Sequence, residues 1–508
     1  MPKYIPVIGM EIHVELKTES KMFCPCKNGY YLQDEPNKNI CPICMGHPGT
    51  LPVINRQALE WTILVGLALN CKIAKTTKFD RKNYFYPDLP KGYQISQYDQ
   101  PLTFDGYLKV GKKNIDIIRI HLEEDTGKLM HEKEGALVDL SRACTPLMEL
   151  VTSPTIESAQ EAKEFCQNYQ QILRYLEVSD ADMEKGQMRC EANVSLQEAG
   201  KFVIDNNEVK ALLEYELNPK VELKNINSFR SLERAIEFEI KRQTKALESG
   251  EKLVQETRGW DDSKASTFTQ RIKETAADYR YFPEPDLPPI EISDELITKL
   301  KSTLPELPEK KLDRFVKQYQ FDIESAKILV SDKNIASYAE QVYSELIGWL
   351  DSLPEVEGTA KEILEKEGKK LAKVVSNWLI NRLFKHLNEH KVKIIQCKIT
   401  AENFAEFLSM IYLNKINNLA AQEILNVMFK TGEAPTKIME EKNLAQVENF
   451  EELEIIIDKI ISENTKAVED FKAGKEASFK YLVGQAMAAT KGKANPATIN
   501  KILQKKLS

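Results

Sequence analysis

The sequence lacks any run of about 18 apolar residues, the length that a helix needs to cross a membrane. Its first residues, MPKYIP, also lack the apolar core of a secretory signal peptide. We therefore expect a cytoplasmic protein that makes no membrane contact. Apolar residues form 42% of the chain and charged residues 29%, which is typical of a soluble globular protein.

Glycine-rich phosphate loops are also absent. No G-x-G-x-x-G pattern occurs, and Gly127-Lys128 lacks both the earlier glycine and the following Ser or Thr of a Walker loop. A nucleotide would therefore have to be held by other groups. The net charge of -7 does not indicate general nucleic-acid affinity, although such an average can hide a local basic surface.

Nine cysteines are present, but a long intracellular chain offers no oxidising environment for a disulfide framework. Four of them cluster as Cys24-Pro-Cys26 and Cys41-Pro-Ile-Cys44, two close pairs separated by a polar, turn-rich loop. Two such pairs match the ligands of a structural tetrathiolate zinc site, and free thiols are the alternative. A closed four-cysteine site would staple the loop and leave no open position for catalysis.

Residues 7–16 (VIGMEIHVEL) alternate apolar and polar side chains, which is the pattern of a strand. Glu11, His13 and Glu15 fall on one face, and the apolar residues between them fall on the other. Carboxylates and an imidazole on one surface suit a divalent metal. The alternative is an ordinary half-exposed strand with solvated acids.

Three further segments place acids at similar positions in the pattern. Glu123 and Glu124 end an apolar strand, where neighbouring carboxylates repel one another unless a cation or solvent lies between them. Glu191 shares one face of a later strand with Arg189, and Glu222 lies on the next strand. The sequence does not show that these acids converge. If they do, the site resembles those that bind magnesium and a nucleoside triphosphate, where catalysis is positioning and charge neutralisation.

Residues 78–99 are dense in aromatic, proline, amide and basic residues and have neither helical nor strand periodicity. This composition predicts a long ordered loop that presents polar groups. Its cations, with Arg189, are candidates to receive phosphates, and the alternative is a solvated basic loop packed by its tyrosines. The loop cations are Lys78, Arg81, Lys82 and Lys91.

Strand patterns give way to helical ones after the four prolines at 283–289, so we expect an α+β fold. The expected strands are 7–16, 115–122, 188–195, 221–225 and a strand, turn and strand over 138–151. The expected helices are 55–69, 156–176, 228–247, 311–319, 335–350, 360–386 and 401–412. After Glu476 the chain carries six lysines and no acid. Such an end could contact nucleic-acid phosphates, and a solubilising helix terminus is the alternative.

Eight motifs carry a resemblance to a known family. They are GMEIHVELKT, KFDRKNYFYPD, YQISQ, HLEEDTGK, MRCEANVS, ELKNINSF, QETR and DYRYFPEPDLPP. Through them the chain, from residue 8 to its end, resembles the B-type subunits of the aspartyl/glutamyl-tRNA amidotransferases. The resemblance implies a mostly antiparallel, catalytic cradle domain over 1–293, an all-α helical domain over 294–443 and a small helical, tRNA-binding tail domain over 444–508.

The resemblance also implies an activity and its partners. ATP and Mg²⁺ would serve to phosphorylate the side-chain carboxylate of Glu-tRNA(Gln), of Asp-tRNA(Asn) or of both, and ammonia would then displace the phosphate. No Ser-Lys or Cys-His arrangement for glutamine hydrolysis is evident. Ammonia would therefore come from an A-type glutaminase (amidase) partner, clasped by a small C-type partner. The magnesium and ATP site would be lined by Glu11, His13, Glu124, Glu191 and Glu222, with Glu123 as a neighbour that shares the role.

The chain departs from the family pattern at several positions. Glu191 stands where Asp is usual and reaches one methylene further. Ser141 and Cys144 replace an Asn and a Gly, which bears on the local turn. The four clustered cysteines occur in only part of the family, so the resemblance implies that their zinc is structural.

Two other hypotheses compete with this one. A zinc-dependent RNA-binding scaffold without activity is the first, but a scaffold has no reason to place acids opposite the apolar face of each of four strands. The archaeal-type paralogue of the family carries an additional domain before its helical region. We reject it because no such insertion is present between residues 281 and 444.

Overall fold

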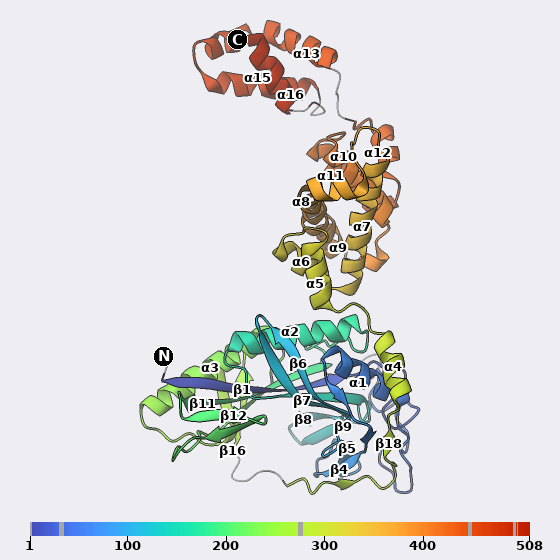
Figure 1. Cartoon of the computed structure of the whole chain (residues 1–508), viewed down its shortest axis with the longest axis vertical. Helices are drawn as coiled ribbons and strands as arrows, with labels where there is room; N and C mark the ends of the chain where they lie inside the picture. Colours follow the sequence, from blue (N-terminus) through green and yellow to red (C-terminus); the bar gives the residue numbers. More distant parts are fainter. Residues whose placement is uncertain are drawn as a thin grey trace. The chain divides into compact units, whose positions relative to one another are not determined.

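The computed structural model describes residues 3–29, 35–272, 278–445, 450–490, 494 and 496–507. The chain divides into two compact units, Met1–Leu307 and Pro308–Ser508, which we describe one at a time. The first unit holds a large sheet and the second is helical, which confirms the expected α+β class (Figure 1). Among the described residues, no helix is both long and apolar enough to span a bilayer.

The first unit contains most of the regular structure that the sequence predicted there. Its strands are β1 (Tyr4–Glu15), β2 (Lys72–Ile73), β3 (Thr76–Thr77), β4 (Asp80–Asn83), β5 (Tyr93–Ser96), β6 (Thr103–Val110), β7 (Lys113–Glu124), β8 (Lys128–Glu132), β9 (Gly135–Asp139), β10 (Pro146–Thr152), β11 (Met188–Glu198), β12 (Phe202–Asp205), β13 (Glu208–Ala211), β14 (Val221–Lys224), β15 (Glu256–Asp261), β16 (Ser266–Ile272), β17 (Phe282–Pro283) and β18 (Ile290–Glu291). Its helices are α1 (Arg56–Ala68), α2 (Ala159–Tyr175), α3 (Phe229–Glu248) and α4 (Asp294–Ser302). The expected strands and helices form within a few residues of their predicted ends.

The helices of this unit begin where the sequence offers a capping side chain. Asn55, Ser158 and Ser228 each accept a hydrogen bond from a backbone N–H in the first turn of α1, α2 and α3. Such a bond satisfies one of the N–H groups that the first turn leaves without a helical partner. The caps therefore fix where each helix starts over the sheet.

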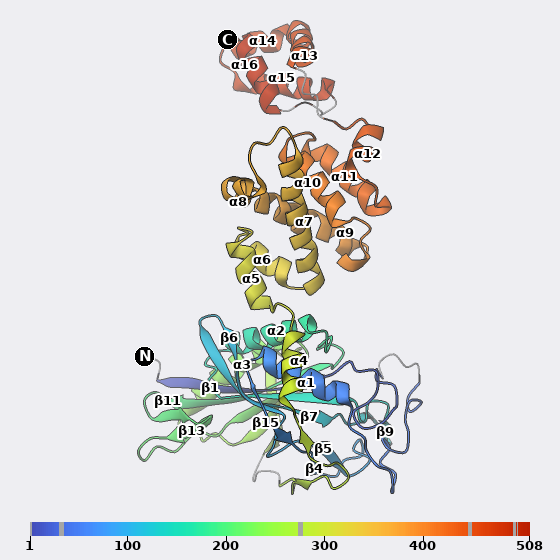
Figure 2. The same ribbon diagram turned by 45° about the vertical axis from the view of Figure 1, so that its right-hand side comes forward.

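Nine of the described strands form one sheet, in the order β16-β15-β14-β11-β1-β10-β7-β6-β2. Neighbours are antiparallel except β14 and β15, and β1 is central, between β11 and β10. The apolar side chains of Met10, Ile12 and Val14 are buried on one face. Figures 1 and 2 show α2 and α3 lying along one side of this sheet, with β4 and β5 on the other. Helical packing on one face leaves the opposite, polar face of β1 for other contacts.

The expectation that residues 78–99 lack regular structure is wrong. They contain β4 and β5, which pair with each other, and β17 adds a third strand beside β4. Each of the first two strands has only four residues, too few for the side-chain pattern to show a period of two. Backbone pairing therefore orders a segment whose composition predicts a loop.

The second unit is built from helices. They are α5 (Pro308–Lys317), α6 (Ile323–Val330), α7 (Lys333–Ser352), α8 (Ala360–Trp378), the π-helical turn η2 (Leu379–Leu383), α9 (Phe384–Glu389), the short η3 (Ile394–Gln396), α10 (Ala401–Tyr412), α11 (Asn418–Thr431), α12 (Pro435–Glu441), α13 (Phe450–Glu463), α14 (Thr465–Lys472), α15 (Glu476–Ala489) and α16 (Pro496–Leu507). The helices expected at 311–319, 335–350, 360–386 and 401–412 correspond to α5, α7, the run α8-η2-α9 and α10.

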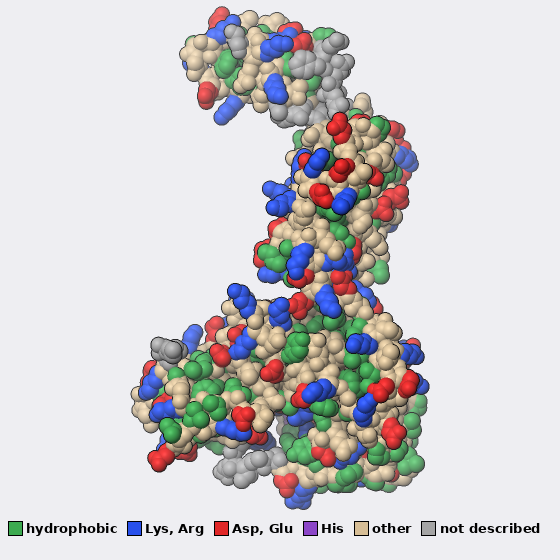
Figure 3. All heavy atoms as spheres, in the orientation of Figure 1, with side chains coloured by type: hydrophobic (Ala, Val, Ile, Leu, Met, Phe, Trp, Pro, Cys, Tyr) green, Lys and Arg blue, Asp and Glu red, His purple; other side chains and the backbone are tan. Residues whose placement is uncertain are grey.

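The last four helices share an apolar core of their own. Leu453 and Ile457 of α13, Leu482 of α15 and Leu503 of α16 are among its buried side chains. The finer division of the chain at residues 293 and 443 stays a prediction. On the face of the molecule in Figure 3, acidic and basic side chains are interspersed within each unit.

Candidate functional site

Three acids from three strands converge because of the register of the sheet. Glu11 of β1 lies directly opposite Glu191 of β11. Glu222 of β14 lies opposite Asn193, two residues further along β11. One carboxylate oxygen from each of Glu11, Glu191 and Glu222 lies within 4.8 Å of the others. The structure thus brings together three residues that the sequence named separately.

A second row of side chains starts at His13 and crosses β10 to β7. His13 pairs in register with Glu149, and Glu149 pairs with His121. His13 Nε2 lies 3.3 Å from Glu149 Oε2 and 3.5 Å from Glu123 Oε1. His121 Nε2 lies 3.4 Å from the same Glu149 oxygen. Both histidines therefore face one nearly buried carboxylate.

The chemistry of these donors decides which metal fits. The group of Glu11, Glu191 and Glu222 offers oxygen atoms only, which is what Mg²⁺ prefers. Two neighbouring groups each combine a histidine with two carboxylates, a mixture that suits a transition metal better. Within the described residues, His121 Nδ1 is buried without a hydrogen-bond partner. The all-oxygen group therefore fits magnesium, and the histidine groups lie beside it.

The protonation of His13 responds to the surrounding carboxylates. Burial disfavours its charge, but the hydrogen bond and charge of Glu149, with the charges of Glu123 and Glu11, raise its pKa to about 9. His13 is thus a cation at neutral pH that offsets the neighbouring acids. Burial and the charge of Glu149 raise the pKa of Glu11, a sign of repulsion that a bound cation would relieve.

Lys224 neutralises part of the all-oxygen group. Its Nζ lies 2.9 Å from Glu191 Oε2 and 3.6 Å from Glu222 Oε1. Burial opposes the charge of Lys224, but these two carboxylates raise its pKa. Glu222 also accepts a hydrogen bond of 2.7 Å from the Thr257 hydroxyl, which fixes its orientation. The ammonium group of Lys224 therefore contacts two of the three carboxylates of the all-oxygen group.

Two of the predicted phosphate-binding cations adjoin the histidine row. Although burial opposes its charge, the carboxylates of Glu123 and Glu149 raise the pKa of Lys82. Arg189 lies opposite His13 across β1 and β11 and donates a hydrogen bond of 3.0 Å to Asp125. Positive charge is thus available at this edge of the acidic cluster.

Two other predicted cations are paired elsewhere. Lys78 Nζ lies 2.7 Å from an oxygen of Asp80 and 2.9 Å from one of Asp99. Arg81 donates two hydrogen bonds, of 2.7 and 2.8 Å, to the buried Glu284 carboxylate. These pairs fasten the small sheet of β4, β5 and β17 and do not join the acidic cluster.

Glu124 also lies apart from the cluster. Successive residues of a strand face opposite sides, so Glu123 approaches His13 while Glu124 points away. The Glu124 carboxylate accepts hydrogen bonds of 2.7 Å from Lys91 Nζ and 3.0 Å from the Ile95 N–H. In this arrangement Glu124 holds β5 against the end of β7.

Sequence reasoning did not assign roles to Glu149 and His121. Glu149 is the single charged residue of β10, whose sequence is PLMELVT, and it is 5% exposed. An isolated acid inside a buried apolar strand needs a partner, which is a signal that the sequence contains. His121 belongs to the HLEED motif, but its place opposite Glu149 depends on strand pairing that the sequence does not reveal.

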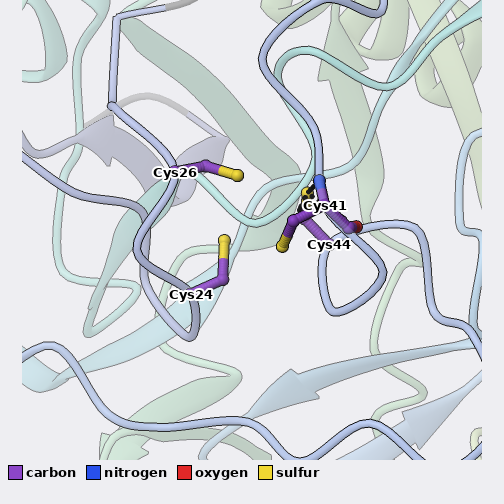
Figure 4. Close-up of side chains that lie close together, drawn as sticks. All are labelled: Cys24, Cys26, Cys41 and Cys44. Carbon is purple, nitrogen blue, oxygen red and sulfur yellow. Dashed lines mark hydrogen bonds between the residues drawn. The ribbon is translucent and has the colours of Figure 1, made fainter.

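The four-cysteine cluster forms a separate site. Figure 4 shows the side chains of Cys24, Cys26, Cys41 and Cys44 directed toward one another, and their sulfur atoms all lie within 4.8 Å of each other. The Cys41 N–H donates a hydrogen bond to Cys44 Sγ, and burial raises the pKa of the Cys26 thiol to about 11. A metal would therefore displace thiol protons as it binds. Four such thiols can hold a metal ion, and their number and kind fit zinc.

The turn at Cys144 keeps the backbone that a glycine would adopt. Cys144 has a φ of +69°, and its Sγ accepts a hydrogen bond from the Phe23 N–H, beside the cysteine cluster. The Ser141 hydroxyl accepts a hydrogen bond from the Asn37 N–H. The two departures from the family pattern are thus accommodated without loss of the turn.

Known proteins resemble this chain along its whole length. Residues 6–298 match the family described as the GatB/GatE catalytic domain, and residues 360–507 match the one described as the GatB domain. A protein of Thermoanaerobacter pseudethanolicus is 46% identical over the whole of both chains. Proteins of Persephonella marina (44% identical, 99% of this chain and 100% of the relative) and Thermotoga maritima (42%, 99% of both) are also similar. All three are named as the B-type subunit of aspartyl/glutamyl-tRNA(Asn/Gln) amidotransferase, which confirms the expected resemblance. The chain therefore belongs to the family of B-type subunits of the tRNA-dependent amidotransferases and carries its catalytic domain.

Proposed function

We propose that this chain activates the side-chain carboxylate of Glu-tRNA(Gln), Asp-tRNA(Asn) or both with ATP and then passes it to ammonia. A carboxylate is a poor acyl donor because its oxygen is a poor leaving group. Attack of the carboxylate oxygen on the γ-phosphorus of ATP gives an acyl phosphate and ADP. Ammonia then attacks the acyl carbon, inorganic phosphate leaves, and the amide of Gln-tRNA(Gln) or Asn-tRNA(Asn) remains.

In this proposal the acids of the sheet hold the metal. Glu11, Glu191 and Glu222 bind Mg²⁺, which when bound neutralises the phosphate oxygens during transfer. His13 lies between Glu149 and Glu123, holds these two carboxylates in place and supplies positive charge next to the ATP phosphates. One observation carries the proposal. Glu11, Glu191 and Glu222 come together from three strands, and a cation, Lys224, already pairs with Glu191.

Cations around the cluster complete the phosphate site. Lys82 and Arg189 lie beside the histidine row, where they would offset negative charge on the phosphates. Glu124 contributes indirectly, because its bonds to Lys91 and Ile95 position the strand that ends at Ser96. The Ser96 hydroxyl in turn donates a hydrogen bond of 3.1 Å to Glu123.

The remaining roles belong to partners and to the rest of the chain. Ammonia is supplied by an A-type glutaminase (amidase) partner held by a small C-type partner, in a heterotrimer. Zinc in the four-cysteine cluster is structural, because four thiolates leave no open coordination position. The basic tail after Glu476 contacts tRNA phosphates, which gives affinity without base specificity.

ADP formation by the reconstituted heterotrimer tests this proposal. Mischarged tRNA, Mg²⁺, ATP and glutamine are supplied, and wild type is compared with Glu191→Gln. We expect glutamine hydrolysis to persist while ADP formation falls about 100-fold or more, because one metal ligand is lost. Unchanged ADP formation would favour the alternative of an RNA-binding scaffold.

Two further variants sharpen the result. Glu198→Gln is the matched control, because Glu198 lies on the same strand but pairs with Lys201 at the surface. It should retain full activity. Glu123→Gln should cost more activity than Glu124→Gln, since only Glu123 faces the cluster. The reverse order would show that Glu124 binds metal directly.

A further inference from the structure

Three potential metal ligands share one side of α9 and the residue that follows it. Glu389 and His390 follow His386 by three and four residues, spacings that place each of them next to His386 at the end of the helix. One ligand atom of each lies within 4.8 Å of the others. Two histidines four residues apart on a helix are a recurrent arrangement for binding a single metal ion.

The ring of His390 is held in the tautomer that a metal needs. Its Nδ1 lies 2.9 Å from the backbone carbonyl oxygen of His386. A carbonyl oxygen can only accept a hydrogen bond, so Nδ1 carries the proton and donates. In the neutral ring the lone pair is then on Nε2, the other nitrogen. Metal-binding histidines commonly donate their second nitrogen to a backbone carbonyl in this way.

An aromatic side chain packs against both rings. The ring of Phe429, on α11, lies with its centre 5.3 Å from that of His386 and 5.0 Å from that of His390. The planes of Phe429 and His386 are tilted by 27°, close to stacked. These contacts restrict the rotation of both imidazoles and so reduce the entropy that metal binding would cost.

We propose that His386, Glu389 and His390 form a site for a divalent transition metal ion. Two imidazole nitrogens and a carboxylate favour Cu²⁺, Zn²⁺ and Ni²⁺ over Mg²⁺ and Ca²⁺, which prefer all-oxygen sites. Competition from Lys385 is weak, since Glu389 makes only an exposed ion pair of 3.8 Å with it. Water molecules complete the coordination, because the side chains lie on an accessible surface.

A metal bound here would stabilise the end of the helical run formed by α8, η2 and α9. The π-helical turn η2 joins α8 to α9, which then ends at Glu389. A metal bound by both His386 and His390 would connect the start of the last turn of α9 to the residue that follows the helix. It would therefore stabilise the end of α9 and its packing against α11.

Nickel binding to the full-length chain tests the proposal. The cysteine cluster is first loaded with zinc and the acidic cluster is saturated with Mg²⁺, and Ni²⁺ is then titrated by calorimetry. We expect a Ni²⁺-binding step that is lost, or weakened at least about tenfold, in His386→Gln and in His390→Gln, while any Ni²⁺ binding at the histidines of the sheet stays the same in these variants. His131→Gln is the matched control, because His131 is exposed on β8 of the other unit, and it should leave the titration unchanged.

A second measurement identifies the ligands. Cu²⁺ bound to wild type should show hyperfine coupling to two imidazole nitrogens in electron paramagnetic resonance, and each single variant should show coupling to one. The proposal is overturned if a variant that combines His386→Gln with His390→Gln binds Ni²⁺ as tightly as wild type. It is equally overturned if the Cu²⁺ spectrum is the same in wild type and in both single variants. Circular dichroism of the variants checks that α9 remains folded.

Discussion

Replacing Lys224 with methionine should tighten divalent metal binding at the acidic cluster. The ammonium of Lys224 lies 2.9 Å from Glu191 and 3.6 Å from Glu222, where it occupies carboxylates that a metal would use. Methionine keeps much of the side-chain length and apolar contact but carries no charge. A metal that enters wild type must displace this cation or bind beside it, whereas in the variant it meets the carboxylates alone.

The size of the effect follows from the charges. A unit charge about 4 Å from a divalent ion costs about 2 kcal/mol in a water-like dielectric and about 8 kcal/mol at an effective dielectric of about 20. The Lys224 side chain is 37% exposed and can move away, so the lower figure applies. About 2 kcal/mol corresponds to an affinity for Mg²⁺ or Mn²⁺ that is roughly 30-fold higher.

The metal-free variant should also be less stable than wild type. Without Lys224, no lysine lies between the carboxylates of Glu191 and Glu222, and the three carboxylates, which have oxygen atoms within 4.8 Å of one another, repel more strongly. Thermal unfolding should therefore begin at a lower temperature without metal and recover on addition of Mg²⁺ by more than wild type does. Titration calorimetry with Mn²⁺ gives the affinity directly. Lys201→Met is the control, because it removes the same charge from an exposed pair with Glu198. Metal affinity that is unchanged or weaker in Lys224→Met would refute the reasoning.

Three further predictions concern stability and the cysteine cluster. Lys21 is 1% exposed and its charge acts on the Cys44 thiol. A zinc tetrathiolate carries two net negative charges, so Lys21→Met should release zinc at least about tenfold faster to a coloured chelator; an equal release rate would exclude this role. The hydrogen bond from Arg314 lowers the pKa of Glu340 to about 2, so the ionised form stabilises the fold above the unfolded pKa of about 4.5 and this contribution disappears as the pH falls toward 2. Glu340→Gln should therefore destabilise α7 by about 1 kcal/mol at pH 7, after allowance for solvent exposure, and by less at pH 3.5, as hydrogen exchange would measure; a pH-independent difference would contradict this. A methyl group at Gly106 would lie 2.8 Å from the Leu69 carbonyl oxygen, so Gly106→Ala should cost about 1–3 kcal/mol of stability in urea unfolding. Gly135→Ala is the control, because a methyl group there meets no atom within 4 Å and the backbone is not in the left-handed region, and it should show no such cost.

The sequence was informative about which face of each strand carries the chemistry, and less so about which strands meet. Alternation placed Glu11 and His13 on one face of β1, because a strand has a period of two and one face must be buried. The pairing of Glu11 with Glu191 joins residues 180 positions apart, and no local pattern encodes it. The pairing of the loop cations likewise depends on residues outside the local pattern. Lys78 pairs with Asp99, and Arg81 pairs with Glu284, so neither joins the acidic cluster.

The two adjacent glutamates of β7 mark the limit of sequence reasoning at this site. Either Glu123 or Glu124 could satisfy the composition of an acidic strand end, and a shift of one residue in register exchanges which of them faces the cluster. The structure resolves the choice through partners: His13 and Ser96 meet Glu123, and Lys91 meets Glu124. Both carboxylate oxygens of Glu124 accept hydrogen bonds on its own side of β7, one from Lys91 Nζ and one from the Ile95 N–H. The register of β7 against β10 therefore decides which of two chemically identical neighbours faces the histidine row.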